Sequence, residues 1–421
     1  MKKVLVMGSG GREHALAKKF QASPQVSAVF VAPGNDGIAT EFETFPSGDF
    51  SQIYGFVLAH NIDLVFVGNE QFLADGIVDF LSAKGVTVIG PTRAAARIES
   101  SKVFCKDLLR SSGVNTAVYE SFTDESAAIA YLQSQSFPVV VKADGLAAGK
   151  GVIIAETKAE AEKCVREILA GELFGDAGNS LIIEEFLVGD EASIFAFCDG
   201  ENFVSTVFAQ DHKKAFDGDK GLNTGGMGAF APVQKFAHLK EKVDATIFAP
   251  VLQAMKKEGC PFTGVLFAGL MIAGESVKVI EFNCRFGDPE TQVILPLLEN
   301  DLYKICVAIA EKKISQHSLV WHSKSALCIV LASKGYPETF EKGHPVNIPA
   351  ELLTDQSLQI CFAGIKNEGG TFVNSGGRVI SLTCIEDSLE KASKYGYQKA
   401  SEIKSDILRY RGDLGKLEIR N

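Results

Sequence analysis

Val277-Lys278-Val279-Ile280-Glu281-Phe282-Asn283-Cys284-Arg285 has polar and apolar side chains in near alternation, which predicts a β-strand with one buried face. Glu281, Asn283 and Arg285 then lie on one side, and the apolar residues between them face the core. A carboxylate beside an amide oxygen is a hard ligand set of the kind that Mg²⁺ prefers when phosphate oxygens complete its shell. The arginine adds a fork for phosphate or carboxylate. The strand therefore predicts a metal–phosphate site, with a solvated strand face and a salt bridge as the alternative.

The segment after this strand, Gly287–Thr291, has the pattern of a helix start with acids in its first turn. An aspartate side chain accepts hydrogen bonds from the free N–H groups of a first helical turn. Asp288 could therefore cap this helix or contact a substrate, and the residues alone favour neither role.

Short loops join strands in pairs through the middle of the chain, and strands joined in this way must be antiparallel. The predicted pairs are Val265–Ile272 with Val277–Cys284, Val139–Lys142 with Val152–Ala155, and Leu181–Leu187 with Ala192–Cys198. Helices are predicted near Asp124–Ser134 and Lys158–Leu169. The middle of the chain is therefore predicted to be α+β, with two β-rich lobes.

The chain on either side of this middle part has a different pattern. Before it, short β-branched runs alternate with helical stretches, which predicts an open, parallel α/β sheet. The strands are Val4–Met7, Ala28–Val31, Leu64–Val67 and Val86–Ile89, with helices near Glu13–Phe20, Phe72–Ala83 and Ser101–Ser112. After it come strands at Ala326–Ala332, Gln359–Phe362 and Val379–Thr383 and a helix near Leu389–Ile407. We predict an α/β and α+β multidomain chain, divided at 1–102, 103–325 and 326–421.

The composition excludes several classes of protein. The net charge is −10 and no basic stripe interrupts it, which argues against a nucleic-acid partner. No apolar run approaches the roughly 18 residues of a spanning helix, so no membrane partner is expected. The nine cysteines are scattered, without metal-ligand spacing, which suits a reducing cytoplasm. No feature of the sequence indicates a stable oligomer, and a monomer or weak homodimer is expected.

The first glycine loop is Gly8-Ser9-Gly10-Gly11-Arg12-Glu13-His14, after the first strand. A dinucleotide fingerprint would need a third glycine where Glu13 stands and an acid after the second strand, which instead ends Val31-Ala32-Pro33. An oxidoreductase is therefore disfavoured. A phosphate-bearing substrate at Gly10 and Gly11, or a purely structural tight turn, remains open. His14 fits a packing role as well as a binding one.

The second glycine loop is Lys142-Ala143-Asp144-Gly145-Leu146-Ala147-Ala148-Gly149-Lys150-Gly151. A Walker A loop is excluded because the spacing is one residue short, no Ser or Thr follows the lysine, and a strand follows the loop. A hairpin tip of small residues that carries a lysine can fold over a triphosphate and act as a lid. The alternative is a mobile surface hairpin, but a second cation at Lys142 has no evident packing purpose.

Together these segments resemble the ATP-grasp superfamily, and within it the family of phosphoribosylamine–glycine ligases, over nearly the whole chain. The resemblance rests on Gly8–His14, Gly90-Pro91, Ser101-Lys102, Lys142–Gly151, Phe174–Gly178, Ile183–Leu187, Gln210–Lys213, Asn223–Gly228, Glu281–Glu290, Lys334–Pro337 and Gly376–Arg378. Each segment is weakly specific alone, whereas this many in family order are highly specific. The resemblance implies an ATP-grasp core of two lobes, with 119–190 as a mobile subdomain over ATP.

The resemblance also implies roles for individual residues. ATP is assigned to Lys102, Lys142, Gly145, Gly149, Lys150, Gly151, Glu184, Glu185, Phe186, Leu187 and Glu191. The divalent metal, Mg²⁺ or Mn²⁺, is assigned to Glu281 and Asn283. Substrate contacts are expected from Gly10, Gly11, Asn223, Thr224, Gly225, Gly226, Arg285 and Asp288, and catalytic roles from Lys150, Asp211, Lys213 and Arg285.

The chain departs from the family pattern at three places. The family's Gly-Pro-Glu-Ala-Pro-Leu is Gly68-Asn69-Glu70-Gln71-Phe72-Leu73 here, a proline is replaced by Leu222, and a threonine is replaced by Ile365. The first and third departures bear on phosphoribosylamine contacts, and none involves the ATP or metal residues.

The implied reaction joins glycine to 5-phosphoribosylamine with ATP as co-substrate, giving glycinamide ribonucleotide, ADP and phosphate through glycyl phosphate, in de novo purine synthesis. No Ser-His-Asp or Cys-His pattern for a protein nucleophile is present, which fits phosphoryl transfer by positioning and charge. The alternatives are another ATP-grasp carboxylate–amine ligase or carboxylase, and a nucleotide sensor without catalysis. The runs Gln210–Lys213 and Asn223–Gly228 favour the glycine ligase.

Overall fold

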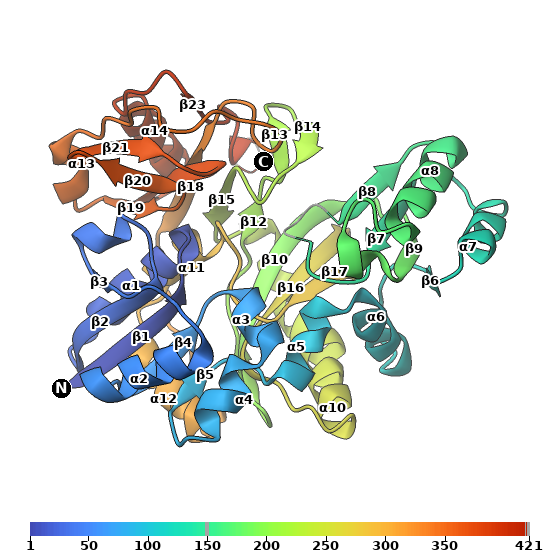
Figure 1. Cartoon of the computed structure of the whole chain (residues 1–421), viewed down its shortest axis with the longest axis horizontal. Helices are drawn as coiled ribbons and strands as arrows, with labels where there is room; N and C mark the ends of the chain where they lie inside the picture. The colour runs from blue at the N-terminus through green and yellow to red at the C-terminus, as the bar shows by residue number, and fades with distance from the viewer. Residues whose placement is uncertain (148–150, 417, 419–421) are drawn as a thin grey trace.

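The computed structural model describes residues 1–147, 151–416 and 418. Its N-terminal part is a parallel sheet, as predicted, but with five strands instead of the four expected, in the order β3-β2-β1-β4-β5 (Figure 1). The strands are β1 Lys2–Gly8, β2 Val26–Pro33, β3 Glu43–Thr44, β4 Leu64–Val67 and β5 Val88–Ile89. The helices are α1 Gly11–Gln21, α2 Phe50–His60, α3 Glu70–Asp75, α4 Ile77–Ser82 and α5 Arg93–Ser100.

The helices of this part differ from the prediction at three places, one of which is α5, where no helix was predicted. The single helix expected over Phe72–Ala83 is wrong, because Gly76 adopts a left-handed φ of 91° that ends α3 and begins α4. Helix α2 was not predicted from the sequence at all. Its start carries a capping box, in which Gln52 N donates to Asp49 Oδ1 at 2.9 Å and Asp49 N donates to Gln52 Oε1 at 3.1 Å. The spacing of Asp49 and Gln52 is the sequence signal from which the start of α2 could have been predicted.

Two antiparallel four-stranded sheets form the middle of the chain. One has the order β6-β9-β7-β8, and the other has the order β11-β10-β16-β17. The first contains β6 Tyr119–Phe122, β7 Val139–Ala143, β8 Val152–Ala155 and β9 Leu181–Glu185, with α7 Glu125–Leu132 and α8 Lys158–Leu169. The second contains β10 Asp190–Asp199, β11 Phe203–Ser205, β16 Thr263–Ala273 and β17 Ser276–Asn283. Figure 1 shows the first sheet and its helices as a lobe that projects from the rest of the molecule.

The predicted pairing of Leu181–Leu187 with Ala192–Cys198 is wrong. Strand β9 pairs with β6 and β7, whereas β10 pairs with β11 and β16. The short connection passes from one sheet to the other instead of folding back as a hairpin. Gly189 lies in this connection, and a Cβ atom there would come within 2.5 Å of the Ile272 carbonyl oxygen. A short loop therefore implies antiparallel neighbours only when both strands stay in one sheet.

The third large sheet has the order β12-β15-β18-β22-β19, with β23 beside β18. Its strands are β12 Gln210–Asp211, β15 Gly228–Ala231, β18 Ser325–Ser333, β19 Leu358–Phe362, β22 Arg378–Glu386 and β23 Leu408–Arg409. Strands from both sides of the proposed boundary at 325/326 thus share one sheet, and the domain limits stay a proposal. The predicted C-terminal helix is shorter than expected, since α14 spans Leu389–Ala400.

The remaining elements complete the frame around these sheets. The hairpins β13 Lys214–Phe216 with β14 Lys220–Asn223, and β20 Ile365–Glu368 with β21 Thr371–Asn374, were not predicted. The other helices used below are α6 Lys102–Ser111 and α11 Thr291–Leu297. All nine cysteines are buried free thiols. In the described ranges, the structure contains no helix of the length and apolarity that crossing a membrane requires.

Candidate active site

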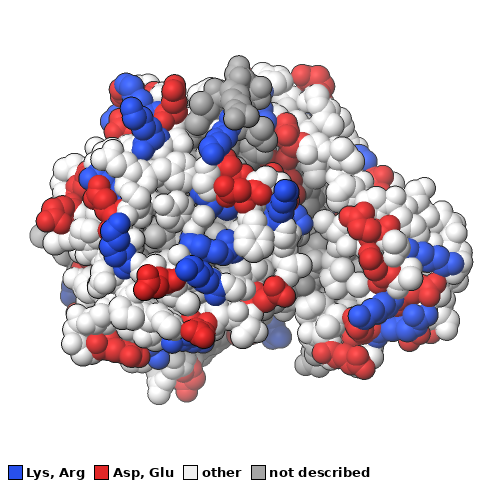
Figure 2. All heavy atoms as spheres, turned by 90° about the horizontal axis from the view of Figure 1, so that it is seen from above, with Lys and Arg blue, Asp and Glu red and all other residues white. Residues whose placement is uncertain are grey.

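A cavity of about 360 Å³ lies where the first glycine loop, α6, β7, β8, β16, β17 and the loop before α11 converge. The predicted site residues that line it are Lys102, Gly145, Gly151, Asp211, Lys213, Thr224, Gly225, Glu281, Asn283, Arg285 and Asp288. Sequence reasoning missed Arg12, Glu70, Glu99, Phe267, Glu290 and Arg378 as lining residues. On the face viewed in Figure 2, Lys and Arg side chains are interspersed with Asp and Glu side chains. The cavity likewise combines both charges.

Glu281 and Asn283 stand side by side on β17, as their spacing predicts. The Asn283 amide nitrogen donates to Glu99 Oε1 at 3.0 Å, which leaves the amide oxygen available for another partner. Burial would raise the pKa of Glu281, but the charges of Lys213, Lys102 and nearby cations outweigh burial and lower it. An ionised carboxylate and a free amide oxygen are suitable ligands for a hard divalent cation.

The other side chains that could act as metal ligands decide how such a cation would be held. Within residues 1–147, 151–416 and 418, no group of three or more His, Cys, Asp or Glu residues has the arrangement of a metal site. Glu281 and Asn283 would therefore form an incomplete protein shell, which phosphate oxygens and water must complete. This incomplete set fits a cation that arrives with a nucleotide triphosphate.

Two arginines of the cavity are held in place by carboxylates. Arg285 Nη2 lies 2.7 Å from Glu99 Oε1, and Arg285 Nε lies 3.1 Å from Glu70 Oε2. Arg12 Nε lies 2.6 Å from Glu13 Oε1, and its Nη2 lies 3.4 Å from Glu70 Oε2. Burial would raise the pKa of Glu70, but the charges of Arg285 and Arg12 lower it to about 2. Glu70 follows β4, at the edge of the sheet where the carboxyl ends of the parallel strands meet. Ligands bind at this edge in open α/β sheets, so the position of Glu70 is the sequence signal from which its place in the cavity could have been predicted.

Lys142 does not line the cavity. It is buried, and its Nζ lies 2.8 Å from Glu184 Oε2. The other carboxylate oxygen, Glu184 Oε1, lies 3.0 Å from Nζ of the buried Lys106, a residue that sequence reasoning missed. Lys142 Nζ also donates to the Ile280 carbonyl oxygen of β17 at 3.4 Å. These contacts connect the projecting lobe to β17 beside Glu281.

The rest of the predicted ATP residues lie around this connection between the sheets. Glu185 Oε1 lies 2.7 Å from Lys278 Nζ, and Phe186 is exposed. Glu191 Oε2 lies 2.9 Å from Lys213 Nζ. Gly149 and Lys150 lie outside the described residues. The roles predicted for all of these residues remain proposals.

The first glycine loop packs against α11 and against the segment that precedes it. Gly10 N donates to Glu13 Oε2 at 2.7 Å, and a Cβ atom on Gly11 would lie 2.9 Å from Gln292 Nε2. Neither glycine lines the cavity. His14 is fully buried and its Nδ1 accepts a hydrogen bond from Phe362 N at 2.9 Å, so the structure favours the packing role over the binding one.

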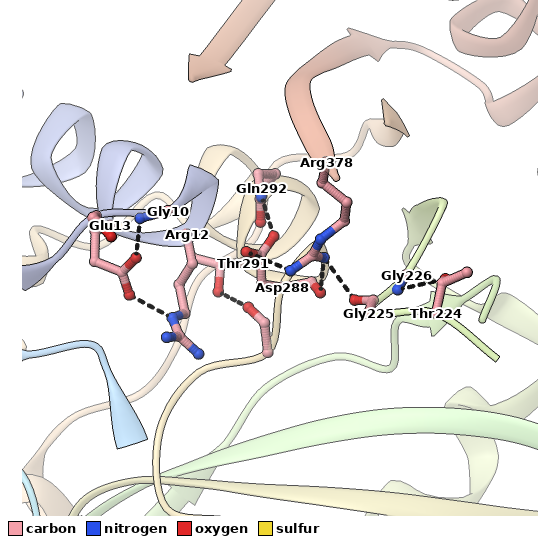
Figure 3. A network of polar contacts seen from close by, with 12 residues as sticks. Gly10, Arg12, Glu13, Thr224, Gly225, Gly226, Asp288, Thr291, Gln292 and Arg378 are labelled. Carbon is pink, nitrogen blue, oxygen red and sulfur yellow. Dashed lines mark hydrogen bonds and ion pairs between the residues drawn. The ribbon is translucent and has the colours of Figure 1, made fainter. Parts of the chain in front are cut away.

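Asp288 does not cap α11, because Glu290 occupies the N-cap position. Its Oδ2 instead lies 3.1 Å from Arg378 Nη2, and its Oδ1 accepts from Gln292 Nε2 at 2.7 Å (Figure 3). Arg378 Nη1 donates to the carbonyl oxygens of Asp288 at 2.7 Å and Gly225 at 2.6 Å. Arg378 therefore connects the C-terminal sheet to the loop before α11 and to the predicted substrate loop.

The predicted substrate loop, Asn223–Gly226, is fixed by its own hydrogen bonds and by Tyr336. Thr224 Oγ1 donates to the Lys213 carbonyl oxygen at 2.7 Å and accepts from Gly226 N at 3.0 Å. Gly225 N donates to Tyr336 Oη at 2.9 Å. Thr224 and Gly225 line the cavity, whereas Asn223 and Gly226 are not among its lining residues.

Three family models match the chain: the phosphoribosylglycinamide synthetase N domain at residues 2–99, its ATP-grasp (A) domain at 100–291 and its C domain at 326–417. Among curated relatives, a phosphoribosylamine–glycine ligase of Streptococcus pneumoniae is 44% identical over 99% of this chain and 100% of its own length. Its counterpart in Vibrio vulnificus (strain YJ016) is 43% identical, over 98% and 97%.

Solved structures agree with these matches. A crystal structure of phosphoribosylamine–glycine ligase from Thermotoga maritima has a TM-score of 0.86 and 32% identity, covering 98% of this chain and 100% of that one. A biotin carboxylase domain from Hydrogenobacter thermophilus has a TM-score of 0.71 over 97% of this chain and 91% of its own, but only 16% identity, so it shows the fold alone. The predicted fold class, with an N-terminal α/β domain, an ATP-grasp core and a C-terminal domain, is confirmed.

Proposed function

The chain belongs to the phosphoribosylglycinamide synthetase family, and we propose that its cavity is where glycine is activated as glycyl phosphate. It is an ATP-grasp ligase that joins glycine to phosphoribosylamine in purine biosynthesis. The observation that carries the proposed site is the meeting of Glu281 and Asn283 with Lys102 in one cavity. That combination suits a triphosphate with a divalent cation.

In the first step, a carboxylate oxygen of glycine attacks the γ-phosphorus of ATP, and the bond between that phosphorus and the ADP oxygen breaks. The step needs alignment and neutralisation of charge, and it needs no protein nucleophile. Lys102 at the start of α6 and Lys142 at the end of β7 supply positive charge for the phosphates. Arg285 supplies a rigid guanidinium because Glu70 and Glu99 fix its orientation.

Enzymes of this superfamily use ATP with a divalent metal ion. Glu281 and Asn283 would hold this ion, for which we propose Mg²⁺ or Mn²⁺, and the ion would neutralise phosphate charge. The fit rests on the ionised Glu281 carboxylate and on the Asn283 oxygen that the contact with Glu99 leaves free.

In the second step, the amine nitrogen of phosphoribosylamine attacks the carbonyl carbon of glycyl phosphate, phosphate leaves, and the nitrogen loses a proton. An acyl phosphate survives only where water is kept out. The small-residue segment at Gly145 and Gly151 lines the cavity and is suited to that role. Substrate contacts are assigned to the Thr224–Gly226 loop and to Asp288.

We propose the cellular compartment, the oligomeric state and the partners of the chain on more general grounds. We assign the chain to the cytoplasm, as a monomer or weak homodimer whose partners are ATP, glycine and 5-phosphoribosylamine. The nine buried thiols and the net charge of −10 support a reducing compartment and small-molecule partners.

Isotope transfer tests the glycyl phosphate step. Glycine labelled with ¹⁸O in its carboxyl group is supplied with Mg-ATP and phosphoribosylamine, and inorganic phosphate is analysed by mass spectrometry. Passage through glycyl phosphate transfers one labelled oxygen to each phosphate released. Phosphate without label, at normal product yield, would exclude the acyl phosphate.

A further inference from the structure

The hairpin of β13 and β14 is connected to the cavity at both of its ends. Lys213 precedes β13 and Thr224 follows β14, and both residues line the cavity. The Lys213 carbonyl oxygen accepts hydrogen bonds from Thr224 N at 2.8 Å and from Thr224 Oγ1 at 2.7 Å. The hairpin is a separate sheet of two strands (Figure 1). Because an isolated two-stranded hairpin is only marginally stable in water, contacts from outside must hold its ends in place.

The hairpin supplies little of this stability itself. Its large apolar side chains, Phe216 and Leu222, are exposed and therefore gain little from burial. At the tip, Asp219 has a φ of 53°, in the left-handed region that side chains rarely adopt, although aspartate and asparagine tolerate it better than most.

Arg411 contacts this hairpin at its foot and at its tip. The residue is near the end of the chain, yet it is only 1% exposed. Its Nη1 donates to the Lys214 carbonyl oxygen at 3.0 Å and lies 2.9 Å from Asp219 Oδ1. Its Nε and Nη2 donate to the two carboxylate oxygens of Asp413, each at 2.8 Å. A planar guanidinium with five donors can connect all of these groups at once.

The segment around Arg411 makes two further contacts with the hairpin tip. Gly412 N donates to Asp217 Oδ1 at 2.9 Å, and Gly218 N donates to Asp413 Oδ2 at 2.7 Å. The C-terminal segment and the tip therefore hold each other through side chains of both partners.

The same segment contacts the residue that separates Asp211 from Lys213. Gly415 N donates to His212 Nε2 at 3.4 Å. Burial and the charge of Arg411 lower the pKa of His212 to about 4, so the ring is neutral at pH 7 and can accept this hydrogen bond. The backbone on both sides of Lys213 is thus fixed by residues close to the C-terminal end.

We propose that Arg411 is a positioning residue for the ligation reaction and holds the hairpin so that Lys213 and Thr224 keep their places in the cavity. The proposal rests on the proposed function, because it assumes that these two residues act on the substrates. The proposed phosphate and metal contacts, Lys102 and Glu281, lie on α6 and β17 and not on the hairpin. Loss of Arg411 should therefore affect glycine and phosphoribosylamine more than ATP.

The test compares Arg411→Gln with wild type in an ADP-formation assay in which ATP, glycine and phosphoribosylamine are varied in turn. Arg166→Gln, at an exposed arginine that also contacts two carboxylates, is the matched control. Leu382→Ala, in the core of β22, is the control for lost stability. Arg411→Gln should lower kcat/KM for glycine and phosphoribosylamine about 10- to 100-fold, through higher KM values as well as lower kcat. Its KM for ATP should change less than about twofold.

Asp219→Asn supplies a second variant that should fold normally, because asparagine tolerates the left-handed conformation and the side chain is exposed. Loss of its charge should raise the same KM values about two- to fivefold. The double variant with Arg411→Gln should lose less than the product of the two single losses, since both changes break one ion pair. A merely structural role would not produce this difference between substrates.

Three outcomes would decide against these assignments. A fall in kcat that follows the folded fraction, with all KM values unchanged as expected for Leu382→Ala, would make Arg411 only structural. If Arg411→Gln does not fold, wild-type KM values in Asp219→Asn would overturn the proposal. If wild type makes no glycine-dependent ADP, the proposed function itself fails.

Discussion

Glu184 Oε2 lies 2.8 Å from Lys142 Nζ in the interior of the protein. The carboxylate has a second cation, since its Oε1 lies 3.0 Å from Lys106 Nζ, and Lys106 Nζ also donates to Thr116 Oγ1 at 2.6 Å. Two ammonium groups around one carboxylate leave a net charge of about +1 next to β17. We therefore propose that Lys106 leaves the charge of Lys142 free for a nucleotide phosphate.

Replacement of Lys106 by Met should make the cluster neutral and weaken ATP binding. We expect the KM for ATP to rise about tenfold, the effect of one partly screened charge, with a smaller change in kcat. Steady-state kinetics measure this, and Lys256→Met, at an exposed lysine, is the matched control. A lower melting temperature with an unchanged KM for ATP would make Lys106 only structural.

Lys142 and Lys150 should act at different moments of the reaction. Lys142 lies within β7 and should bind ATP in the ground state, so Lys142→Ala should mainly raise the KM for ATP. Lys150 belongs to the second glycine loop, and Lys150→Ala should lower kcat more than it raises the KM. Equal losses of ATP affinity in both variants, with kcat intact, would remove this distinction.

Asn283→Leu should strongly raise the Mg²⁺ concentration required for activity, because leucine is similar in size and offers no oxygen ligand. Asn283→Asp keeps an oxygen and should be tolerated in part, although it places a carboxylate against Glu99. Titration of activity with Mg²⁺, alongside melting temperature, measures both. Normal Mg²⁺ dependence in a stable leucine variant would place the metal elsewhere.

The contacts of Glu70 predict a pH-dependent contribution to stability. Its pKa is lowered from 4.5 to about 2 in the folded protein, so its contribution is present above about pH 4.5 and is lost as pH falls towards 2. Glu70→Gln should cost about 1–3 kcal/mol of unfolding free energy at pH 7, discounted because the side chain is partly exposed. Urea unfolding at pH 7 and pH 3 measures it. A difference from wild type that is equal at both pH values would contradict the assignment.

The sequence predicted well those features that depend on local pattern. The period of two in Val277–Arg285 placed Glu281 and Asn283 on the same face of β17, and the structure has them there. It did not predict features that depend on tertiary contacts. The pairing of β9 with β6 and β7, and the ion pair of Lys106 on α6 with Glu184 on β9, both join segments that are far apart in the sequence.

Glu290 is an example, within the site, of a residue whose role the local sequence pattern does not predict. The sequence placed Glu290 in the first turn of a predicted helix, whereas its place in the cavity with Asp211 depends on tertiary contacts. A residue far away in sequence, Ser193, fixes its carboxylate.

The central claim, glycine activation by phosphoryl transfer from ATP, is tested most directly by product analysis. Purified protein is mixed with ATP, Mg²⁺, glycine and freshly made phosphoribosylamine, and the nucleotides are separated. The account predicts ADP that depends on glycine, increases strongly with phosphoribosylamine and is not accompanied by AMP, while leucine fails to replace glycine. AMP with pyrophosphate, or equal ADP release when bicarbonate replaces glycine, would contradict it.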